Sequence, residues 1–477
     1  MNTLFTILLV IVLAFSALVI WKWNTWFGNP PETAYVTPAT PDRVILTMGE
    51  DGTHTRRISW RCDTTLTEGW VELTQENTSD TLKLPAQGAL VSSRSGHSAF
   101  YRTELSGLQS GATYHYRVVN APHASAWYTF SIPQPDSALS FIYIGDIQDQ
   151  VEGSTQDLFR SINRQHPEVA FWALGGDVIE RPTDAYWSYW YSTMDSIAGK
   201  KPFIAATGNH EYLKGVIKVL DPRWTYSFSN PENSPKEFAG RSYVVNFKDL
   251  CYIVIDTDGI QGAVSLYRHR DWLKKVLSTC DKKWKIVMMH HPVYSVREGR
   301  NNFYVRYTFK PLFEAYGVDL VLQGHDHGYS RITTKTKNLQ KRGPVYIVSS
   351  SSPKAYNIGF DRIHDRLGSN LQLYQYITIQ GDTLRYKAYT PEQELYDDLS
   401  LIHHGDKAAI VIDHAEQLPE HLELPPAYRN GKKVNLEKYR QKVKERETYK
   451  KAAATKKVTT GALTPAYPTP AKIIPIV

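Results

Sequence analysis

Metal-competent side chains recur at the ends of apolar runs in the middle of this chain. Five such runs, each typical of a buried strand, end in a carboxylate, an amide or an imidazole. The groups are Asp146 in IYIGD, Asp177 in FWALGGD, Asn209 and His210 in GNHE, His290 and His291 in VMMHHP, and His325 and His327 in GHDH. Imidazole and carboxylate ligands together suit zinc, iron and manganese. One such pair occurs by chance in many chains, but five at successive strand ends predict a metal centre.

The glycines in these motifs bear on how the side chains meet. Ligands of an open α/β sheet bind beyond the carboxyl ends of its strands, where the two glycines before Asp177 predict a tight turn. An N-cap of the following helix is the alternative role for Asp177, since Asp is favoured there. Two residues at i and i+2 of an extended chain point to opposite faces. His325 and His327 therefore converge only on a turn, which Gly324 and Gly328 favour.

The elements that must position these groups follow from the patterning. Residues 136–400 alternate apolar strand-like runs with amphipathic helical stretches, which predicts a layered α/β domain. Residues 42–135 instead contain short alternating runs punctuated by Gly, Asn, Ser and Pro, which predicts a small antiparallel β-sandwich. The run ELSGLQSGATYHYRVV within it resembles a fibronectin type III module. We interpret 29–41 as a linker and 401–477 as a basic, partly disordered tail.

The first 28 residues predict a membrane segment. Leu4 to Trp21 is apolar and uncharged, close to the roughly 18-residue lower limit for spanning a bilayer. Tryptophans at its end suit the membrane interface. A cleaved signal peptide is the alternative, but a basic stretch before the run and a small-residue cleavage site after it are missing. We expect an exported, membrane-anchored protein with its α/β domain in the periplasm or outside the cell.

The distribution of charge limits the classes of binding partner, and the cysteine content bears on disulfide pairing. The net charge is +7, yet twelve Lys or Arg and three Asp or Glu lie between Arg429 and Lys457, so the rest of the chain carries about −2. Nucleic acid is therefore not expected as the main partner. The tail either touches an anionic surface weakly or only aids solubility. Cys251 and Cys280 either pair in an oxidising compartment or remain free, as Cys62 would.

The ordered series GD, GGD, GNHE, VMMHHP and GHDHGYSR resembles the calcineurin-like metallophosphoesterase superfamily. It is most similar to the purple acid phosphatase branch, whose members carry a fibronectin-like domain in front. The likeness covers roughly residues 42–390. It implies an α/β fold, with a two-sheet β-sandwich flanked by helices and preceded by an all-β sandwich.

Carried over by position, the resemblance implies a dinuclear centre of iron, zinc or manganese ions. Asp177 would bridge the two metals, because a carboxylate has two oxygens. His210 would contact the phosphate and help to protonate the leaving group, and imidazole titrates in the range this role needs. The other ligands would be Asp146 and His327 for the first metal, and Asn209, His290 and His325 for the second.

The sequence departs from the purple branch at several positions. Glu180 replaces the tyrosine that ligates ferric iron, and Gln148 occupies the position of a histidine ligand in the wider superfamily. We expect a colourless protein in which Gln148 or Glu180 holds the first metal; the alternative is that neither touches it. The loop after Pro292 lacks the branch's phosphate-contacting histidines, so Arg297 or Arg300 are candidates to replace them.

The implied function is a metal-dependent phosphatase, in which hydroxide held by the metals attacks a phosphomonoester. Hydrolysis of phosphodiesters or nucleotides is an alternative within the superfamily, because both reactions use the same metal clamp. A different class is an exported, non-catalytic binding or scaffold protein. The intact set of ligand positions disfavours that reading.

Overall fold

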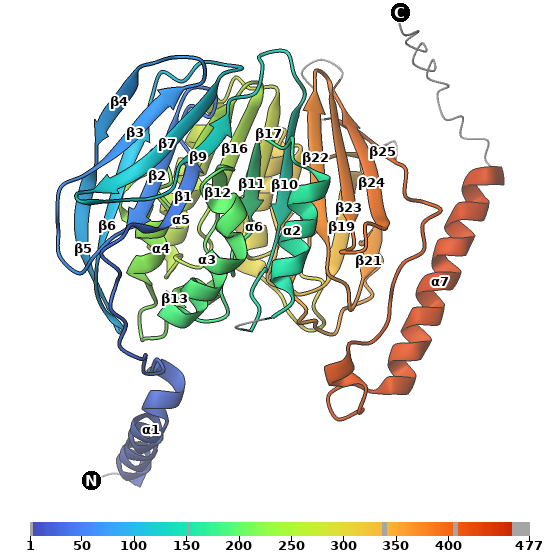
Figure 1. The fold of residues 1–477 in the computed structure, drawn as a ribbon. Helices are drawn as coiled ribbons and strands as arrows, with labels where there is room; N and C mark the ends of the chain where they lie inside the picture. The colour runs from blue at the N-terminus through green and yellow to red at the C-terminus, as the bar shows by residue number, and fades with distance from the viewer. Residues whose placement is uncertain (1–2, 151–152, 336–340, 404–408, 460–477) are drawn as a thin grey trace, which may run out of the picture. The chain divides into compact units, whose positions relative to one another are not determined.

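The computed structural model describes residues 3–150, 153–335, 341–403 and 409–459 of the chain (Figure 1). Contacts divide the chain into two compact units, Met1–Pro425 and Pro426–Val477. The first unit holds every strand described below, and its helices cover the sheets. The second is mainly one long helix.

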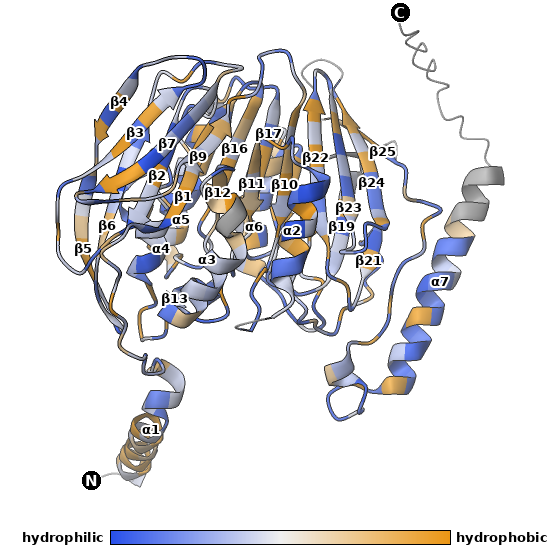
Figure 2. Ribbon diagram, in the orientation of Figure 1, coloured by the Kyte–Doolittle hydropathy of each residue, from blue (hydrophilic) through white to orange (hydrophobic). Residues whose placement is uncertain are grey.

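The chain begins with a single apolar helix, α1 (Thr3–Phe27). Hydrophobic residues predominate in the N-terminal part of α1 (Figure 2), and none of its apolar stretch is buried. By length and composition α1 is able to cross a bilayer, and a signal sequence would have the same properties.

A β-rich segment follows and forms two antiparallel sheets around one core. One sheet has the order β5-β6-β2-β1, and the other β4-β3-β7-β8 with β9 beside β7. Its strands are β1 (Asp42–Met48), β2 (Arg56–Arg61), β3 (Gly69–Gln75), β4 (Thr81–Pro85), β5 (Gln87–Ser93), β6 (Gly96–Leu105), β7 (Thr113–Asn120), β8 (His123–Ala124) and β9 (Tyr128–Ser131). The core takes apolar side chains from both sheets, among them Trp60 and Tyr116. β1 also pairs in parallel with β12 of the next region, through Thr47 and Phe203.

Two mixed sheets make up the α/β region. One has the order β12-β11-β10-β22-β23-β24-β25, and the other β15-β16-β17-β18-β20-β19-β21, and the pairing of β20 with β25 joins them. The first sheet comprises β10 (Leu139–Ile144), β11 (Phe171–Leu174), β12 (Phe203–Ala205), β22 (Tyr374–Gln380), β23 (Thr383–Tyr389), β24 (Leu395–Ile402) and β25 (Ile410–Asp413). The second comprises β15 (Tyr243–Phe247), β16 (Leu250–Ile255), β17 (Trp284–Met289), β18 (Leu320–Gln323), β19 (Tyr329–Lys335), β20 (Lys341–Val348) and β21 (Arg366–Gly368). A short hairpin, β13 (Tyr212–Leu213) and β14 (Val219–Leu220), stands apart from them.

Strand pleating explains why these strands are apolar on both faces. Phe141 and Tyr143 of β10 enter the core between the sheets, whereas Ile142 and Ile144 enter the core beneath the helices. α2 (Thr155–Gln165) and α3 (Asp184–Ala198) cover the first sheet, and α5 (Ala263–Thr279) and α6 (Phe303–Ala315) cover the second. The expected α/β sandwich of two mixed sheets flanked by helices is confirmed, as is the all-β domain before it.

The covering helices are amphipathic in the way their sequences predict. α2 buries Leu158, Phe159 and Ile162, at the three- and four-residue spacing of a single helix face. The aromatic stretch of α3 packs in the same core through Trp187 and Trp190. The remaining short helices are α4 (Pro222–Ser227), η1 (Asn209–Glu211), η2 (Lys236–Phe238) and η3 (Pro426–Tyr428).

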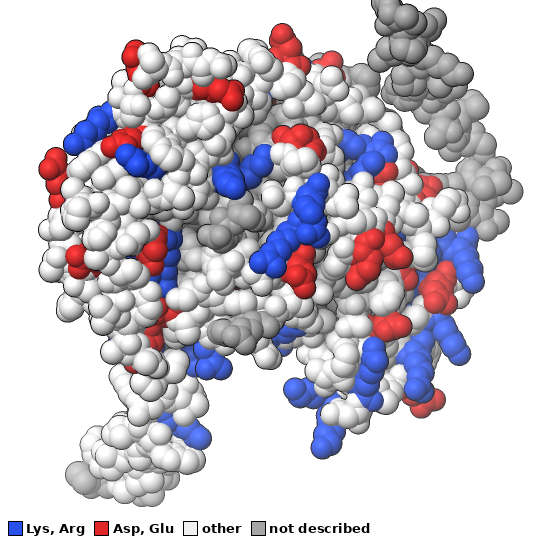
Figure 3. Space-filling model, viewed as in Figure 1, with Lys and Arg blue, Asp and Glu red and all other residues white. Residues whose placement is uncertain are grey.

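The second unit contains α7 (Leu436–Thr459), a strongly polar helix. Lys and Arg side chains gather along α7 in the surface view (Figure 3). The sheet region extends past residue 400, because Ile410–Asp413 pairs with β24 as β25. The end of the predicted tail, from residue 460, lies outside the described residues.

The two cysteines considered for pairing lie together. Cys251 is on β16, and Cys280 is the C-cap of α5. Both thiols are free, and a side-chain hydrogen bond joins them. Cys62 is buried in the β-rich domain.

Candidate metal centre

The candidate ligands come together where strands of both sheets end. Asp146 follows β10, Asp177 follows β11, and Asn209 follows β12. His290 directly follows β17, and His325 comes just after β18. The capping alternative for Asp177 is excluded, because α3 begins at Asp184 with Thr183 as its N-cap.

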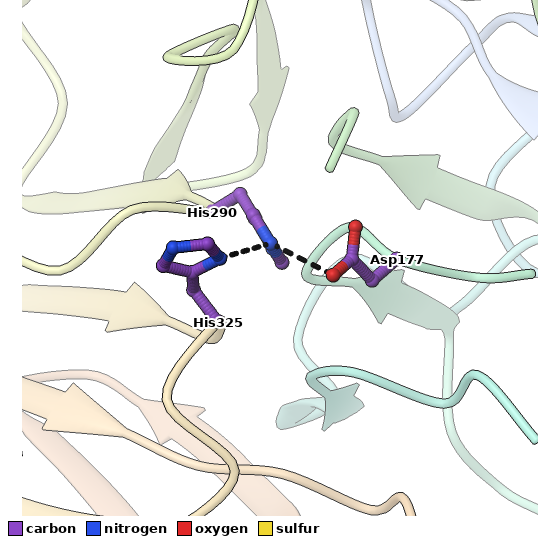
Figure 4. Close-up of side chains that lie close together, drawn as sticks. All are labelled: Asp177, His290 and His325. Atoms are coloured by element: carbon purple, nitrogen blue, oxygen red, sulfur yellow. Dashed lines mark hydrogen bonds and ion pairs between the residues drawn. The ribbon is translucent and has the colours of Figure 1, made fainter. Parts of the chain in front are cut away.

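Asp177, His290 and His325 form the centre of the site (Figure 4). One ligand atom from each lies within 4.8 Å of the others. His290 Nε2 is 3.1 Å from Asp177 Oδ2 and 3.1 Å from His325 Nδ1. The Nδ1–H of His290 donates to the Gly175 carbonyl at 3.0 Å, which leaves Nε2 directed at the site. This pattern orients a metal-binding imidazole.

Asp146 and His327 flank this trio. Asp146 Oδ1 is 3.9 Å from both His327 Nε2 and His290 Nε2. The backbone N–H of His325 donates to the Asp146 carboxylate at 2.6 Å. His327 Nδ1 lies 3.0 Å from the Lys354 carbonyl, so its Nε2 also points toward Asp146.

Four of these residues adopt left-handed backbone conformations. The φ angles are +45° at Asp146, +51° at Asp177, +75° at His325 and +45° at His327. Such angles are uncommon outside glycine, and strained residues cluster at functional sites. The two histidines of GHDH therefore converge through their own backbone, and the glycines beside them are not the only cause.

Asn209 and His210 begin η1 beside the trio. His210 donates its backbone N–H to Asp177 Oδ1 at 2.8 Å, and its Nε2 lies 4.0 Å from Asp177 Oδ2. Its Nδ1–H donates to the Glu180 carbonyl at 2.5 Å, which fixes the ring and directs Nε2 into the site. Asn209 is half-buried.

Gln148 and Glu180 contact each other at the edge of the site. The Gln148 amide N–H donates to Glu180 Oε2 at 2.8 Å, and the same nitrogen lies 3.4 Å from His210 Nε2. Gln148 is 1% exposed. Its Oε1 is buried and has no hydrogen-bond partner in the part of the chain that the structure describes.

The two candidate phosphate-binding arginines have different surroundings. Arg300 Nη1 donates to Asp326 Oδ1 at 2.8 Å and to the His325 carbonyl at 3.1 Å. The Arg297 guanidinium instead lies over the Tyr356 ring, 4.0 Å from its centroid. Asp326 also accepts from the backbone of Val296, so it organises the whole loop.

Sequence reasoning missed Glu211, the last residue of GNHE. It is fully buried, and its carboxylate accepts backbone N–H bonds from Gly208 at 2.6 Å and Asp177 at 3.0 Å. Val178 and Ile179 donate to its other oxygen. One carboxylate therefore ties the GGD turn to the GNH turn. A buried charge next to four backbone donors has no signature in the sequence beyond its place in the motif.

The charges of the site suit a cation. Burial would raise the pKa of Asp177, but the charges and hydrogen bonds of the neighbouring His290 and His210 together outweigh burial and hold that pKa well below its usual range. Burial raises the pKa of Asp146, and the charge of Asp177 adds to the effect. Burial lowers the pKa of His327 to about 3 and takes that of His325 well below its ordinary value. Both imidazoles are thus neutral, the form in which histidine binds metals.

His291, next to the candidate ligand His290, has no ligand role in the motif pattern. Its Nδ1 is 3.1 Å from Thr257 Oγ1 and 3.5 Å from Asp258 Oδ2. Its ring centroid lies 4.3 Å from that of His325. His291 therefore packs against the ring of the candidate ligand His325.

Comparisons with known proteins agree with this geometry. Residues 139–329 match the family model described as calcineurin-like phosphoesterase, and residues 41–132 match the N-terminal domain of purple acid phosphatases. The chain therefore contains a calcineurin-like phosphoesterase domain. The first match covers all the strand ends named above but not the last strands of the α/β region. The second match covers the β-rich domain in front of that region.

Individual relatives of this phosphoesterase are distant. It is 29% identical over 174 residues to purple acid phosphatase 15 of Arabidopsis thaliana, covering 34% of this chain and 31% of that protein. It is 25% identical over 272 residues to the phosphoenolpyruvate phosphatase of Allium cepa, covering 54% of this chain and 56% of that one. The chain thus spans about a third to a half of the length of these relatives.

Solved structures support the fold of this phosphoesterase. The purple acid phosphatase PPD1 from yellow lupin seeds superimposes with a TM-score of 0.65 at 17% identity, covering 77% of this chain and 75% of that one. PhoD superimposes with a TM-score of 0.57 at 10% identity, covering 89% of this chain and all of that one. The match to the N-terminal domain of purple acid phosphatases agrees with the branch that the motif series indicated, and the lupin structure shows a shared fold.

Proposed function

We propose that this protein is a dinuclear metal-dependent phosphatase that hydrolyses phosphomonoesters. The observation that supports it most directly is the trio of Asp177, His290 and His325, whose ligand atoms lie within 4.8 Å of one another. Two further groups, Asp146 and His327, stand beside this trio at the ends of neighbouring strands.

The residues present fit two metal ions. The proposed first site contains Asp146 and His327, and the second contains Asn209, His290 and His325, with Asp177 shared between them. Gln148 supports the first site, because its buried Oε1 lacks a partner among the described residues and a cation would satisfy it. Amide and carboxylate oxygens are hard donors, so we propose a divalent first metal of the zinc, iron or manganese group.

The two ions, when bound, would supply Lewis-acid activation of water and of the phosphoryl oxygens. The chain's own residues would position the Asp177 carboxylate at the centre of the site and protonate the departing alcohol. The backbone N–H of His210 donates to Asp177 Oδ1, which helps to position this carboxylate at the centre of the site. His210 presents Nε2 to the site because the Glu180 carbonyl holds Nδ1–H. In its protonated form this Nε2 can donate a proton to the departing alcohol oxygen.

Glu180 bears on the appearance of the protein. It stands where purple acid phosphatases carry the tyrosine that binds iron, and its carboxylate accepts from Gln148. We therefore propose a colourless enzyme. A strong tyrosinate-to-iron absorption band in the visible spectrum of the purified protein would contradict this.

The activity is tested with p-nitrophenyl phosphate on the wild type, Asp177→Asn and the control Asp271→Asn, whose carboxylate is exposed on α5. Asp177→Asn should lose more than the 10- to 100-fold typical of residues that only orient a ligand. The control should match the wild type. Unchanged turnover in Asp177→Asn would refute the metal mechanism, and an inactive wild type would favour a non-catalytic binding or scaffold role.

A substrate panel would narrow the class. Bis(p-nitrophenyl) phosphate reports on the phosphodiesterase alternative, ATP on nucleotide hydrolysis, and phosphoenolpyruvate on the activity named for the onion relative. We expect the monoester to be cleaved faster than the diester.

We further propose that α1 anchors the enzyme to a membrane and that the catalytic domain is exported. The helix is 25 residues long and exposed throughout the window that could span a bilayer. Sequencing the mature N-terminus distinguishes the two fates. Retention of Met1 to Gly28 supports an anchor, and a mature chain that starts beyond the helix would show a cleaved signal.

A further inference from the structure

Two cationic side chains gather on one aromatic ring at the edge of the metal centre. The Arg297 guanidinium carbon lies 4.0 Å from the centroid of Tyr356, and Lys354 Nζ lies 5.8 Å from it. All three side chains are half-buried. We call Arg297, Lys354 and Tyr356 the Tyr356 cluster.

The Tyr356 cluster is built onto the ligand His327. The Tyr356 ring meets the His327 ring edge to face, with centroids 4.7 Å apart and planes at 67°. The backbone N–H of Tyr356 donates to the His327 carbonyl at 3.2 Å, and the Lys354 carbonyl lies 3.0 Å from His327 Nδ1. The Tyr356 cluster therefore lies next to the position that a phosphate held through His327 would occupy.

The positive charge of the cluster is largely uncompensated by the protein. The Arg297 guanidinium has its aromatic contact but no hydrogen bond or ion pair within the described part of the chain. Arg300, three residues on, differs because Asp326 already holds it at 2.8 Å. Lys354 pairs with Glu180 only at 3.6 Å, and its side chain is 38% exposed.

Local structure pre-positions Arg297 for a ligand. An isolated β-bridge joins the backbones of Arg297 and Ile358, and the backbone N–H of Glu298 donates to the Asn357 carbonyl at 3.0 Å. The loop therefore lies beside the segment that carries Tyr356. Stacking on Tyr356 leaves the guanidinium edge, with its planar N–H donors, open to an acceptor. That edge matches the paired oxygens of a phosphate or carboxylate.

We propose that the Tyr356 cluster binds a second anionic group of the substrate, a phosphate or a carboxylate, while the metal centre holds the phosphate to be cleaved. The proposal rests on the proposed phosphatase function and names its substrate class. The preferred substrates are small phosphomonoesters that carry a second anion, in place of esters of neutral alcohols.

Ligand affinity tests this without turnover. Isothermal titration of the metal-loaded protein compares methylphosphonate, phosphonoacetate and methylenediphosphonate, which carry no second anion, a carboxylate and a second phosphonate. The wild type should bind at least one of the two probes that carry a second anionic group about tenfold or more tightly than methylphosphonate, as expected for one charge-assisted hydrogen-bonded contact. The stronger of the two identifies the second group.

Arg297→Met keeps an unbranched apolar stem over Tyr356 and removes the guanidinium. Its ratio of affinities for the preferred probe over methylphosphonate should fall at least tenfold. Arg270→Met, which alters an exposed arginine of α5, should retain the wild-type ratio. Lys354→Met should lower the ratio in the same direction.

Two results would overturn the proposal. One is a wild type with no preference for either dianionic probe. The other is a preference that survives in Arg297→Met, because the second anion would then be held by the metals themselves. An inactive enzyme that still shows the Arg297-dependent ratio would refute the phosphatase function but not the anion site, so the two failures are distinguishable.

Discussion

An alanine at position 208 tests how closely the two turns of the metal centre approach each other. Gly208 precedes Asn209, and a Cβ added there would lie 2.2 Å from the Asp177 backbone nitrogen and 2.2 Å from Asp177 Oδ1. Real Cβ contacts stay at or above 3.0 Å, so the GNH turn and the Asp177 carboxylate must separate by about 0.8 Å. Neither neighbouring atom belongs to the free end of a flexible chain. Asp177 is 2% exposed and is tied to Glu211.

The expected cost has two parts. Overpacking a close-packed interior typically costs about 1–3 kcal/mol of unfolding free energy. Displacing a catalytic group by about 1 Å can cost about 100-fold in rate. We therefore expect Gly208→Ala to lower kcat/KM on p-nitrophenyl phosphate by about two orders of magnitude, more than its loss of stability alone would explain.

The matched control is Gly359→Ala. A Cβ there would have its nearest neighbour at 3.7 Å, an ordinary contact. Denaturant unfolding, metal content per chain and phosphatase kinetics are measured on both variants. If Gly208→Ala keeps wild-type metal content and a kcat/KM within about threefold of the wild type, the close approach of the two turns is not needed and the reasoning fails.

Three further changes probe other parts of the molecule. Gln148→Leu removes the buried Oε1 that we assign to the first metal, so one metal per chain should bind about 10- to 100-fold more weakly. The control is Gln441→Leu, on the exposed face of α7. Equal metal retention by the two variants would exclude the assignment of Gln148 to the first metal. Glutathione disulfide should oxidise Cys251 and Cys280 to a disulfide, with release of two equivalents of glutathione, because a hydrogen bond between the two thiols lowers the pKa of Cys280 to about 6. Burial instead raises the pKa of Cys62 to about 12, so this thiol should not react. Peptide mapping that finds Cys62 in the disulfide would contradict this prediction. Burial lowers the pKa of His269, so this histidine takes up a proton in the unfolded chain before it does so in the folded protein as the pH falls through about 6.5, and folding stability is lost below that pH. The His269→Phe variant should therefore lose less unfolding free energy between pH 7 and pH 5.5 than the wild type. An equal loss in the two proteins would show that His269 does not contribute to this pH dependence.

The strand-end motifs carried most of what could be read from the sequence. A run such as FWALGGD marks a strand buried on both faces, and in a layered α/β fold the polar residue after it lies at the edge where ligands bind. Asp177, His290 and His325 could therefore be placed together before their distances were known. The motif series also indicated, through the family resemblance, the two-sheet fold that brings them there.

Contacts made by side chains across long sequence separations were not predictable in this way. Glu211 and Asp177 are 34 residues apart, and only the folded turns show that one carboxylate accepts four backbone N–H groups. Arg297 and Arg300 look equivalent in the loop sequence, yet Asp326 neutralises one and leaves the other on Tyr356. Gln148 and Glu180 were both named as ligand candidates, but their mutual hydrogen bond came from the structure.

We propose that the strand ends hold two metal ions and that Asp177 bridges them. Elemental analysis of wild-type protein purified without added metal, beside Asp177→Asn and Asp271→Asn prepared identically, tests it most directly. The account predicts two equivalents of metal per chain in the wild type and in Asp271→Asn, and fewer than one in Asp177→Asn. Wild-type protein that cleaves phosphate esters with no bound metal, or an Asp177→Asn variant that keeps both equivalents, would contradict it.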